Sequence, residues 1–285
     1  LDDEVLESDE NVMGDVRDAG SVMGLMQGVA TVYHLAALIA IPYSYVAPRS
    51  YLDTNAGGTL NVLEAARVLG TERVVHTSTS EVYGTARTAP IDESHPLQAQ
   101  SPYAASKVAA DKLAESYHLS FGLPVVTLRP FNTFGPRQSA RAVIPTIISQ
   151  IAAGERTIHV GSLTPTRDFT FVADTAAAFM AAGISDAPAV VGETFNAGTG
   201  VEISIGDLAS TIAEVMGEDV DFISDDERVR PEASEVMRLI ADAEKLRAAT
   251  GWSPRHTLAG GLQTACEWFQ DPGNLSRYKT TVYNV

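Results

Sequence analysis

The chain has 285 residues, a formal net charge of −16 and 45% hydrophobic residues. This length allows one large or two modest domains, and the composition is typical of a soluble globular protein. The negative charge disfavours nonspecific binding to DNA or RNA. The best candidate for a membrane helix, Val32–Ile41, is far shorter than the roughly 20 residues required, and we interpret it as a buried strand followed by a loop.

The first half of the chain alternates between strand and helix patterns, which favours a mainly parallel sheet. Short β-branched runs predict strands at Thr31–Ala36 and Arg73–Thr79. Between them a helix is expected over 51–69, with Gly70 as its stop signal. The histidines on these strands, His34 and His76, lie on apolar faces, where core histidines with satisfied hydrogen bonds are expected rather than acid–base groups.

A tyrosine and a lysine four residues apart open the next predicted helix, residues 103–121. This spacing places Tyr103 and Lys107 on one face of the helix. A nearby ammonium favours the phenolate, so Tyr103 is expected to accept a proton from an alcohol near neutral pH. With nine tyrosines in the chain, the pair alone has little weight. Its position after a strand that ends in hydroxyls strengthens it, because ligands bind at such strand ends.

The remaining patterns continue the α/β alternation. Asp225–Glu227 is expected to be a solvated loop rather than a metal site, since no further ligand is suitably spaced. Cys266 excludes an internal disulfide, favours a reducing cytoplasm and is expected to be buried filler. The other predicted elements are strands at Pro124–Arg129 and Arg156–Val160, a helix at Ala142–Gly154, and helices near 205–217, 242–250 and 259–270.

The motifs, in their order and spacing, resemble the extended short-chain dehydrogenase/reductase family, and within it the NAD-dependent nucleotide-sugar epimerases and dehydratases. The similarity is greatest to bacterial nucleotide-N-acetylglucosamine 4,6-dehydratases. It spans nearly the whole chain and rests on these segments: Gly14–Asp18, His34–Ala37, Asn55–Asn61, Thr77–Gly84, Ser101–Lys107, Arg129–Pro136, Arg167–Asp174, Phe195–Gly198 and Arg230–Pro231.

The resemblance implies an α/β fold with a doubly wound, mainly parallel Rossmann-type sheet and a smaller α/β substrate domain. Residues 1–134 plus about 168–197 are expected to form the NAD-binding domain, and about 135–167 plus 198–285 the nucleotide-sugar-binding domain. The family's glycine-rich phosphate loop is absent from the sequence. We therefore expect that about fifty residues of a complete enzyme are missing, that the sheet lacks its first strands, and that this polypeptide binds cofactor poorly.

The resemblance also implies roles for individual residues. Tyr103 and Lys107 form the base dyad, Thr79 bonds the sugar C4 oxygen, and Glu81 removes the C5 proton. Ser80 replaces the acid that glucose-type dehydratases carry, so the acid for the departing hydroxyl is Glu81 itself or a water held by Ser80. The expected NAD contacts are Asp15, Val16, Leu35, Ala36, Ala37, Asn55, Thr77, Ser78, Tyr103, Lys107 and Pro130. The expected substrate contacts are Thr79, Asn132, Arg141, Val143, Arg167 and Arg230.

These roles predict a 4,6-dehydratase that oxidises C4, eliminates water across C5 and C6 and reduces C6. The expected substrate is a nucleotide-linked N-acetylglucosamine, with UDP or GDP left open, and the expected pathway is surface-glycan synthesis. Three alternatives remain: a 4-epimerase, a UDP-glucuronate decarboxylase with a cation near the C6 carboxylate, and a cofactor-binding protein without turnover. The resemblance further implies a cytoplasmic homodimer that pairs through the helices near 51–69 and 103–121, with no metal, nucleic acid or membrane partner.

Overall fold

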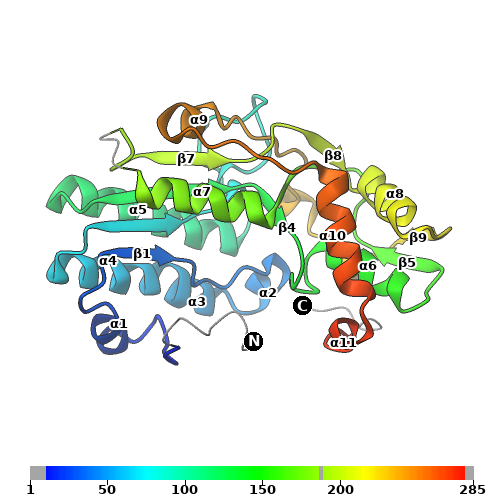
Figure 1. The fold of residues 1–285 in the computed structure, drawn as a ribbon, viewed down its shortest axis with the longest axis horizontal. Coiled ribbons are helices and arrows are strands. Elements are labelled where there is room, and N and C mark those ends of the chain that lie inside the picture. The colour runs from blue at the N-terminus through cyan, green and yellow to red at the C-terminus, as the bar shows by residue number, and fades with distance from the viewer. Residues whose placement is uncertain (1–10, 186–188, 280–285) are drawn as a thin grey trace.

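A four-stranded parallel sheet forms the centre of the larger half of the protein (Figure 1). The computed structural model describes residues 11–185 and 189–279. The sheet has the order β1-β2-β3-β7, and every neighbouring pair is parallel. This confirms the predicted mainly parallel α/β fold. The strands are β1 (Thr31–His34), β2 (Arg73–Thr77), β3 (Val125–Pro130) and β7 (Thr194–Ala197).

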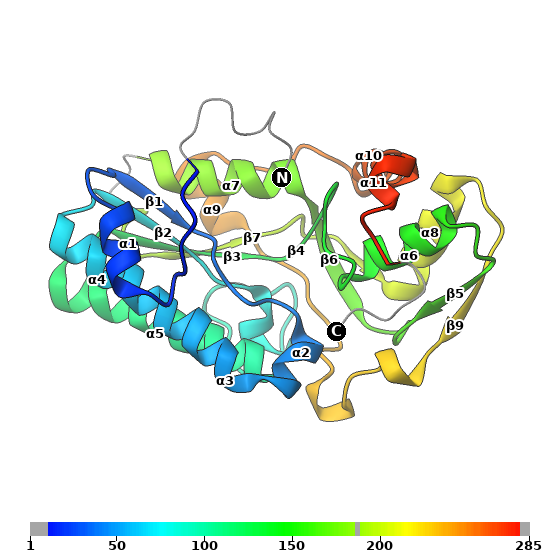
Figure 2. The same cartoon turned by 90° about the horizontal axis from the view of Figure 1, so that it is seen from below.

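Helices cover both faces of this sheet (Figure 2). The helices α4 (Gly58–Leu69) and α5 (Pro102–Phe121) pack together on one face, where α1 (Ala19–Leu25) lies against α4. The opposite face carries α7 (Val172–Ile184), which contacts β1, β2 and β3. The parallel strands therefore have apolar neighbours on both sides, as parallel sheets require.

The predicted helix over 51–69 is present, but its part from Leu52 to Gly57 is π-helical rather than α-helical. The chain passes through α2 (Ile41–Val46), α3 (Pro48–Tyr51) and a π-helical turn at Leu52–Gly57 before α4 begins. The wide turn directs the buried side chain of Asn55 away from the helix ladder, where it bonds the backbone of Leu38. Such π-turns occur mainly at functional sites.

Two strand predictions need smaller corrections. The strand predicted to reach Thr79 ends at Thr77; Ser78 still donates its N–H to the Leu128 carbonyl of β3, and Thr79 then caps the following turn. The segment Val32–Ile41 is not uniformly buried: Leu35 and Ile39 are 61% and 63% exposed. Among the described strands β1 is at the edge of the sheet, so apolar residues that follow it have fewer neighbours to cover them.

The smaller half has its own hydrophobic core, built around Phe134, Ile147, Leu208 and Phe269. A sheet in the order β4-β6-β8 and a two-stranded pair β5-β9 contribute to it. Its elements are β4 (Asn132–Phe134), α6 (Val143–Ala152), β5 (Thr157–Val160), β6 (Thr166–Phe171), β8 (Glu202–Ser204), α8 (Ile205–Met216), β9 (Asp221–Ser224), α10 (Leu258–Gln270) and α11 (Pro272–Leu275).

The C-terminal part of the chain does not belong wholly to the smaller core. The helix α9 (Glu244–Thr250) packs on β7, and its Leu246, together with Trp252, lies in the core of the main sheet. The chain therefore crosses between the two halves once more before α10 begins. The predicted division at 198–285 does not include this return.

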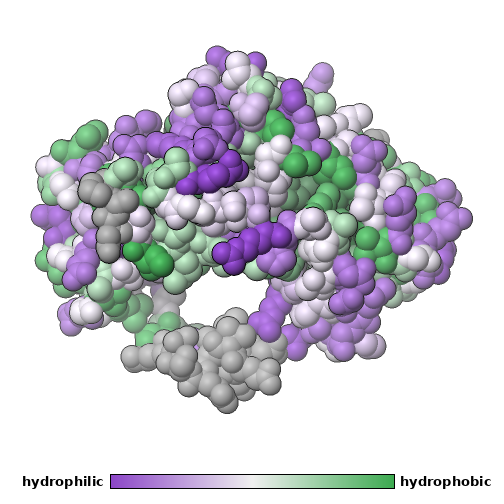
Figure 3. All heavy atoms as spheres, turned by 45° about the horizontal axis from the view of Figure 1, so that its top comes forward, coloured by the Kyte–Doolittle hydropathy of each residue, from purple (hydrophilic) through white to green (hydrophobic). Residues whose placement is uncertain are grey.

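The described residues contain no helix that combines the length and apolar character needed to cross a bilayer. On the face shown in Figure 3, hydrophilic residues predominate and hydrophobic ones form separate patches. The acidic run at Asp225–Glu227 lies in a short turn, where Asp225 accepts bonds from the Glu227 N–H and from the Arg228 side chain. Cys266 is buried in the smaller core, as predicted.

Candidate active site

The turn after β2 holds three of the predicted catalytic residues. Thr79 has an extended backbone and accepts the Glu81 N–H at 3.2 Å, so it caps the 3₁₀ helix Ser80–Tyr83. Ser80 and Glu81 are both buried in this helix, with Glu81 only 9% exposed. The turn ends at Gly84, whose φ of 66° is unfavourable for other residues. A carboxylate on a turn would ordinarily face solvent, so the burial of Glu81 requires a polar environment around it.

The tyrosine–lysine pair lies at the start of α5. Ser101 caps this helix by accepting the Ala104 N–H at 3.1 Å, and Pro102 occupies its first turn, an arrangement that suits helix starts. Tyr103 and Lys107 are 7% and 3% exposed. The Lys107 ammonium donates to the Thr77 carbonyl at the end of β2. The predicted dyad therefore sits at the carboxyl edge of the parallel sheet, next to the Thr79 turn.

The electrostatics of the dyad differ from the prediction. Burial raises the pKa of the Tyr103 phenol, and the Glu81 carboxylate raises it further, while a hydrogen bond with Thr79 acts to lower it. The expectation of a phenol with a lowered pKa is therefore wrong for the protein without ligands. Burial also lowers the pKa of Lys107 to about 8, with Asp111 acting in the opposite direction. Desolvation is the largest cause of both shifts because both groups are buried.

Glu81 faces two arginines that come from distant parts of the chain. Its Oε1 lies 4.0 Å from Nη1 of Arg230, and its charge also acts on Arg167, whose pKa burial lowers. Glu235 lies between the two arginines, 3.2 Å from Nη2 of Arg167 and 3.5 Å from Nη1 of Arg230. Glu81 therefore has the polar environment that its burial requires, and it lies on the same side as Tyr103.

A cavity of about 160 Å³ adjoins these arginines and contains most of the predicted substrate residues. Among the described residues, buried Oδ1 of Asn132 and Nη1 of Arg230 have no hydrogen-bond partner. Arginine forks suit phosphate and carboxylate groups, so the cavity is suited to an anionic ligand. Of the residues predicted to bind substrate, Asn132, Arg141, Val143, Arg167 and Arg230 line it.

The predicted cofactor residues form a second group along β1 and β2. A cavity of about 330 Å³ with mainly apolar walls includes Asp15, Val16, Leu35 and Ala36. The hydroxyl of Thr77 is buried and has no hydrogen-bond partner within residues 11–185 and 189–279. Apolar walls suit a flat base and the free hydroxyl can bond a ligand, so these residues fit NAD. When bound, NAD takes a hydride from the substrate and later returns it.

The other predicted cofactor residues connect the two groups. The Asn55 amide bonds the Leu38 backbone and the Ser106 hydroxyl, which joins the loop after β1, where Ala37 lies, to the helix of the dyad. Pro130 is the last residue of β3. The Ser78 hydroxyl donates to Asp111 at 2.8 Å, so its proton is committed to a structural bond.

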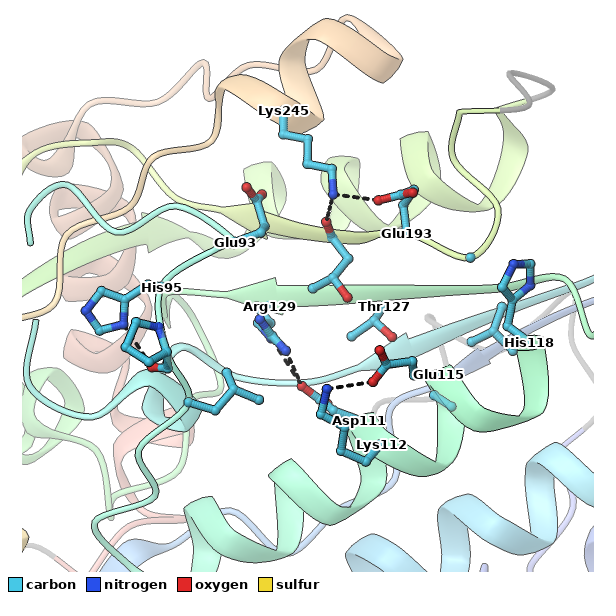
Figure 4. Close-up of a pocket in the computed structure, with 16 residues that line it drawn as sticks. Glu93, His95, Asp111, Lys112, Glu115, His118, Thr127, Arg129, Glu193 and Lys245 are labelled. Atoms are coloured by element: carbon cyan, nitrogen blue, oxygen red, sulfur yellow. Dashed lines mark hydrogen bonds and ion pairs between the residues drawn. The ribbon is translucent and has the colours of Figure 1, made fainter. Parts of the chain in front are cut away.

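A larger cavity, of about 430 Å³, lies elsewhere, between α5 and the strands β3 and β7 (Figure 4). None of the predicted site residues lines it. Its exposed charges pair with one another, Lys112 with Glu115 at 2.6 Å and Lys245 with Glu193 at 2.7 Å. Size alone therefore does not identify the active site here, and the burial of the dyad and Glu81 does.

Sequence reasoning missed several polar residues around the site. Asp111 on the dyad helix accepts a bond from Ser78, Tyr83 in the Glu81 turn bonds Arg129 of β3, and Glu235 lies in the anion cavity. One signal was available: Asp111 follows Lys107 by four residues, so it lies on the same helix face. No local pattern points to Tyr83 or Glu235, because their partners are distant in sequence.

Comparison with known proteins places this site in context. The family model described as GDP-mannose 4,6 dehydratase matches residues 3–265. A UDP-glucose 4-epimerase of Mycolicibacterium smegmatis is 35% identical over 268 residues, which cover 92% of this chain and 83% of that protein.

Solved structures that are similar to this chain also include nucleotide-sugar dehydratases and epimerases. A dTDP-glucose 4,6-dehydratase of Streptomyces venezuelae, a double mutant with NAD and DAU bound, has a TM-score of 0.84 at 27% identity, covering 95% of this chain and 82% of that one. A UDP-glucuronic acid 4-epimerase of Bacillus cereus, in complex with UDP-glucuronic acid and NAD, has a TM-score of 0.86 at 27% identity, covering 94% and 83%. The chain thus belongs to the GDP-mannose 4,6-dehydratase-like family of the extended short-chain dehydrogenases/reductases, and it is an NAD-dependent enzyme of the nucleotide-sugar dehydratase and epimerase group.

Proposed function

We propose that the protein is a 4,6-dehydratase that converts a nucleotide-linked N-acetylglucosamine into its 4-keto-6-deoxy derivative. The observation that carries this proposal is the buried carboxylate of Glu81, close enough to Tyr103 to raise its pKa. Plain epimerisation at C4 needs only the dyad, whereas elimination across C5 and C6 needs a second base. A carboxylate held inside the site supplies one.

The proposed steps use the side chains of the chain itself. Tyr103 accepts the proton of the C4 hydroxyl as the hydride leaves C4, while Thr79 bonds that oxygen. The resulting ketone acidifies the C5 hydrogen, Glu81 removes it as a proton, and the C6 hydroxyl leaves as water after receiving a proton. That proton comes from Glu81 itself or from a water held by Ser80. The hydride then returns to C6 and a proton to C5, so the cofactor ends oxidised.

The arginine cavity supports nucleotide-sugar binding. Arg167 and Arg230 supply guanidinium groups suited to the diphosphate, and the free Oδ1 of Asn132 offers an acceptor. We propose that the sugar extends from this cavity toward Glu81 and Tyr103. The division into an NAD-binding part (1–134 plus about 168–197) and a nucleotide-sugar-binding part (about 135–167 plus 198–285) remains part of the proposal.

One observation favours a second candidate, an enzyme that acts on a nucleotide-linked uronate. Nη1 of Arg230 is buried, forms no hydrogen bond with the described residues, and lies 3.5 Å from Glu235 Oε1 and 4.0 Å from Glu81 Oε1. A cation so close to the proposed C5 base could instead receive a sugar carboxylate at C6. In that case the ketone at C4 would promote loss of carbon dioxide or inversion at C4.

The test is product analysis by NMR with UDP- and GDP-sugars in heavy water. The dehydratase gives a 4-keto-6-deoxy sugar with deuterium at C5, an epimerase gives an inverted C4 without deuterium, and a decarboxylase gives a pentose and carbon dioxide. Glu81→Gln should abolish dehydration and leave partial C4 oxidation. Glu115→Gln, an exposed carboxylate on α5, is the matched control and should keep full activity. Normal dehydration by Glu81→Gln would remove Glu81 from the mechanism.

We also propose that the protein is a cytoplasmic homodimer that participates in surface-glycan synthesis. The outer ends of α4 and α5 expose apolar residues that a partner would cover, notably Val68, Leu119 and Phe121, each more than half exposed. Light scattering coupled to size exclusion tests the dimer, and a monomer at micromolar concentration contradicts it.

A further inference from the structure

Asp111 is a buried carboxylate that the proposed chemistry does not use. It lies on α5 one turn after Lys107 and is 4% exposed. Three residues bond its two oxygens. His76 contacts Oδ1 at 3.1 Å, and Ser78 donates to Oδ2 at 2.8 Å. Arg129 also donates to Oδ2, from Nε at 3.1 Å and Nη2 at 2.9 Å, as Figure 4 shows.

The bonds of Asp111 directly reach one end of the catalytic turn, residues 79–83. Ser78 is the residue before Thr79, and its hydroxyl proton is given to Asp111. The Asp111 carboxylate is part of the helix that carries Tyr103 and Lys107. The start of the turn is therefore tied to the dyad helix by a buried, charge-assisted hydrogen bond.

The other end of the turn is tied through Arg129. Its Nη1 donates to the Tyr83 hydroxyl at 2.9 Å, and its guanidinium lies 4.9 Å from the centre of the Tyr83 ring. The Tyr83 hydroxyl in turn donates to Asn196 on β7 at 2.7 Å. Tyr83 is the last residue of the 3₁₀ helix and is fully buried. One carboxylate thus holds the residues on both sides of Thr79 and Glu81.

We infer that Asp111 is the positioning residue of this active site, which sets Thr79 and Glu81 against Tyr103 and Lys107 by anchoring both ends of their turn to α5. The inference rests on the proposed roles of those four residues. Catalysis is sensitive to such positioning, since a displacement of about 1 Å can cost about 100-fold in rate. Asp111 does not touch the substrate in this scheme.

The charge of Asp111 is available at every working pH. Burial acts to raise its pKa, but the hydrogen bond from His76, the charge of Arg129 and the bond from Ser78 together lower it to about 2. An ion pair of this kind could stabilise the fold without affecting catalysis. A test must therefore include a measurement that a purely structural role would leave unchanged.

The test compares Asp111→Asn with Asp174→Asn in the NAD-loaded enzyme. Asp174 is a similarly buried carboxylate on α7 that accepts bonds from Arg255 and His256 and so ties α7 to the segment before α10. We expect Asp111→Asn to lower kcat for C4 oxidation about 100-fold, with KM within about twofold. Hydrogen exchange of the amides of residues 79–83 should be faster. Asp174→Asn should lower the Tm while leaving kcat and these amides unchanged.

A second variant keeps the test decisive if Asp111→Asn does not fold, which is possible because it leaves the Arg129 charge buried without its partner. Tyr83→Phe removes one hydroxyl and keeps the ring, and should lower kcat about tenfold and speed exchange in the turn. Folded variants with wild-type kcat, or with unchanged exchange at 79–83, would overturn the inference. Dehydratases and epimerases both oxidise C4, so this test does not depend on the elimination step. If the wild-type enzyme oxidises C4 but takes up no deuterium at C5, only the proposed elimination is refuted.

Discussion

The side chains of the candidate site have pKa values that differ from those in water. Lys107 is almost fully buried with no carboxylate bonded to it, and burial lowers its pKa to about 8. Tyr103 is buried beside the Glu81 carboxylate, which raises its pKa. A positive charge arriving near Tyr103 would lower the pKa of its phenol, and the oxidised nicotinamide carries one. The phenol is thus expected to become an effective base only in the loaded enzyme.

We predict that Lys107→Met changes stability in a pH-dependent way. The pKa of Lys107 is about 8 in the folded protein and 10.5 as its ordinary value. Between these values the unfolded chain binds more protons, so the stability of the wild type rises with pH through this window. Relative to wild type, Lys107→Met should therefore be most stable below pH 8 and lose that advantage toward pH 10.5.

Urea unfolding at pH 7, 9 and 10.5 measures this difference. Lys112→Met is the control, because Lys112 is an exposed lysine on the same helix that pairs with Glu115. Its difference from the wild type should vary little over the same range. A Lys107→Met difference that is constant with pH would show that the amine is not buried as described.

At the scale of elements, the catalytic turn depends on how the chain leaves it. Gly84 ends the turn with φ 66° and ψ −160°, a region that is essentially restricted to glycine. A Cβ at Gly84 would lie 2.5 Å from the backbone oxygen of Gln98. Gly122 ends α5 with the same φ, but a Cβ there meets nothing within 4 Å. A side chain at Gly122 would therefore meet only backbone strain, whereas one at Gly84 would meet backbone strain and a steric clash.

We predict that Gly84→Ala destabilises the protein more than Gly122→Ala and that only the former impairs catalysis. Gly122→Ala should cost about 1–2 kcal/mol, the usual cost of a left-handed residue with a side chain. Gly84→Ala must also displace the Gln98 backbone or the Glu81 turn. Urea unfolding and kcat measure the two effects, and equal losses in both variants would contradict the described packing.

At the scale of the whole molecule, the smaller half has a hydrophobic core of its own, separate from the clusters around the main sheet. Cys266 lies in the smaller core, away from the site, and burial raises the pKa of its thiol to about 12. Its modification therefore requires the smaller core to open. The rate at which Cys266 is modified therefore reports how often the smaller core opens.

We predict that a thiol reagent labels Cys266 only through such opening. An opening free energy of about 4 kcal/mol slows labelling about a thousandfold relative to a free thiol. Ser210→Cys provides an exposed thiol on α8 in the same half and should be labelled immediately. Rapid labelling of native Cys266 would contradict its burial.

Much of the fold could be predicted from the sequence because its signals are local. Apolar β-branched runs indicated the strands β1, β2 and β3, and a left-handed glycine ends α4 at Gly70, where the sequence predicted its stop. The spacing of Tyr103 and Lys107 placed both on one helix face. The π-helical turn at Leu52–Gly57 had no such signal, since it depends on what Asn55 bonds across the fold.

The sequence by itself determined the alternating α/β order, the tyrosine–lysine pair and the family resemblance, because each is written in neighbouring residues or in fixed spacings. Only the tertiary structure decided how charges meet. Asp111 reaches Arg129, Tyr83 reaches Asn196 over 113 positions, and Arg230 comes within 4.0 Å of Glu81. The tertiary structure also raises the pKa of Tyr103, where the sequence predicted a lowered one. Desolvation depends on every atom packed around the phenol, and no local pattern encodes that environment.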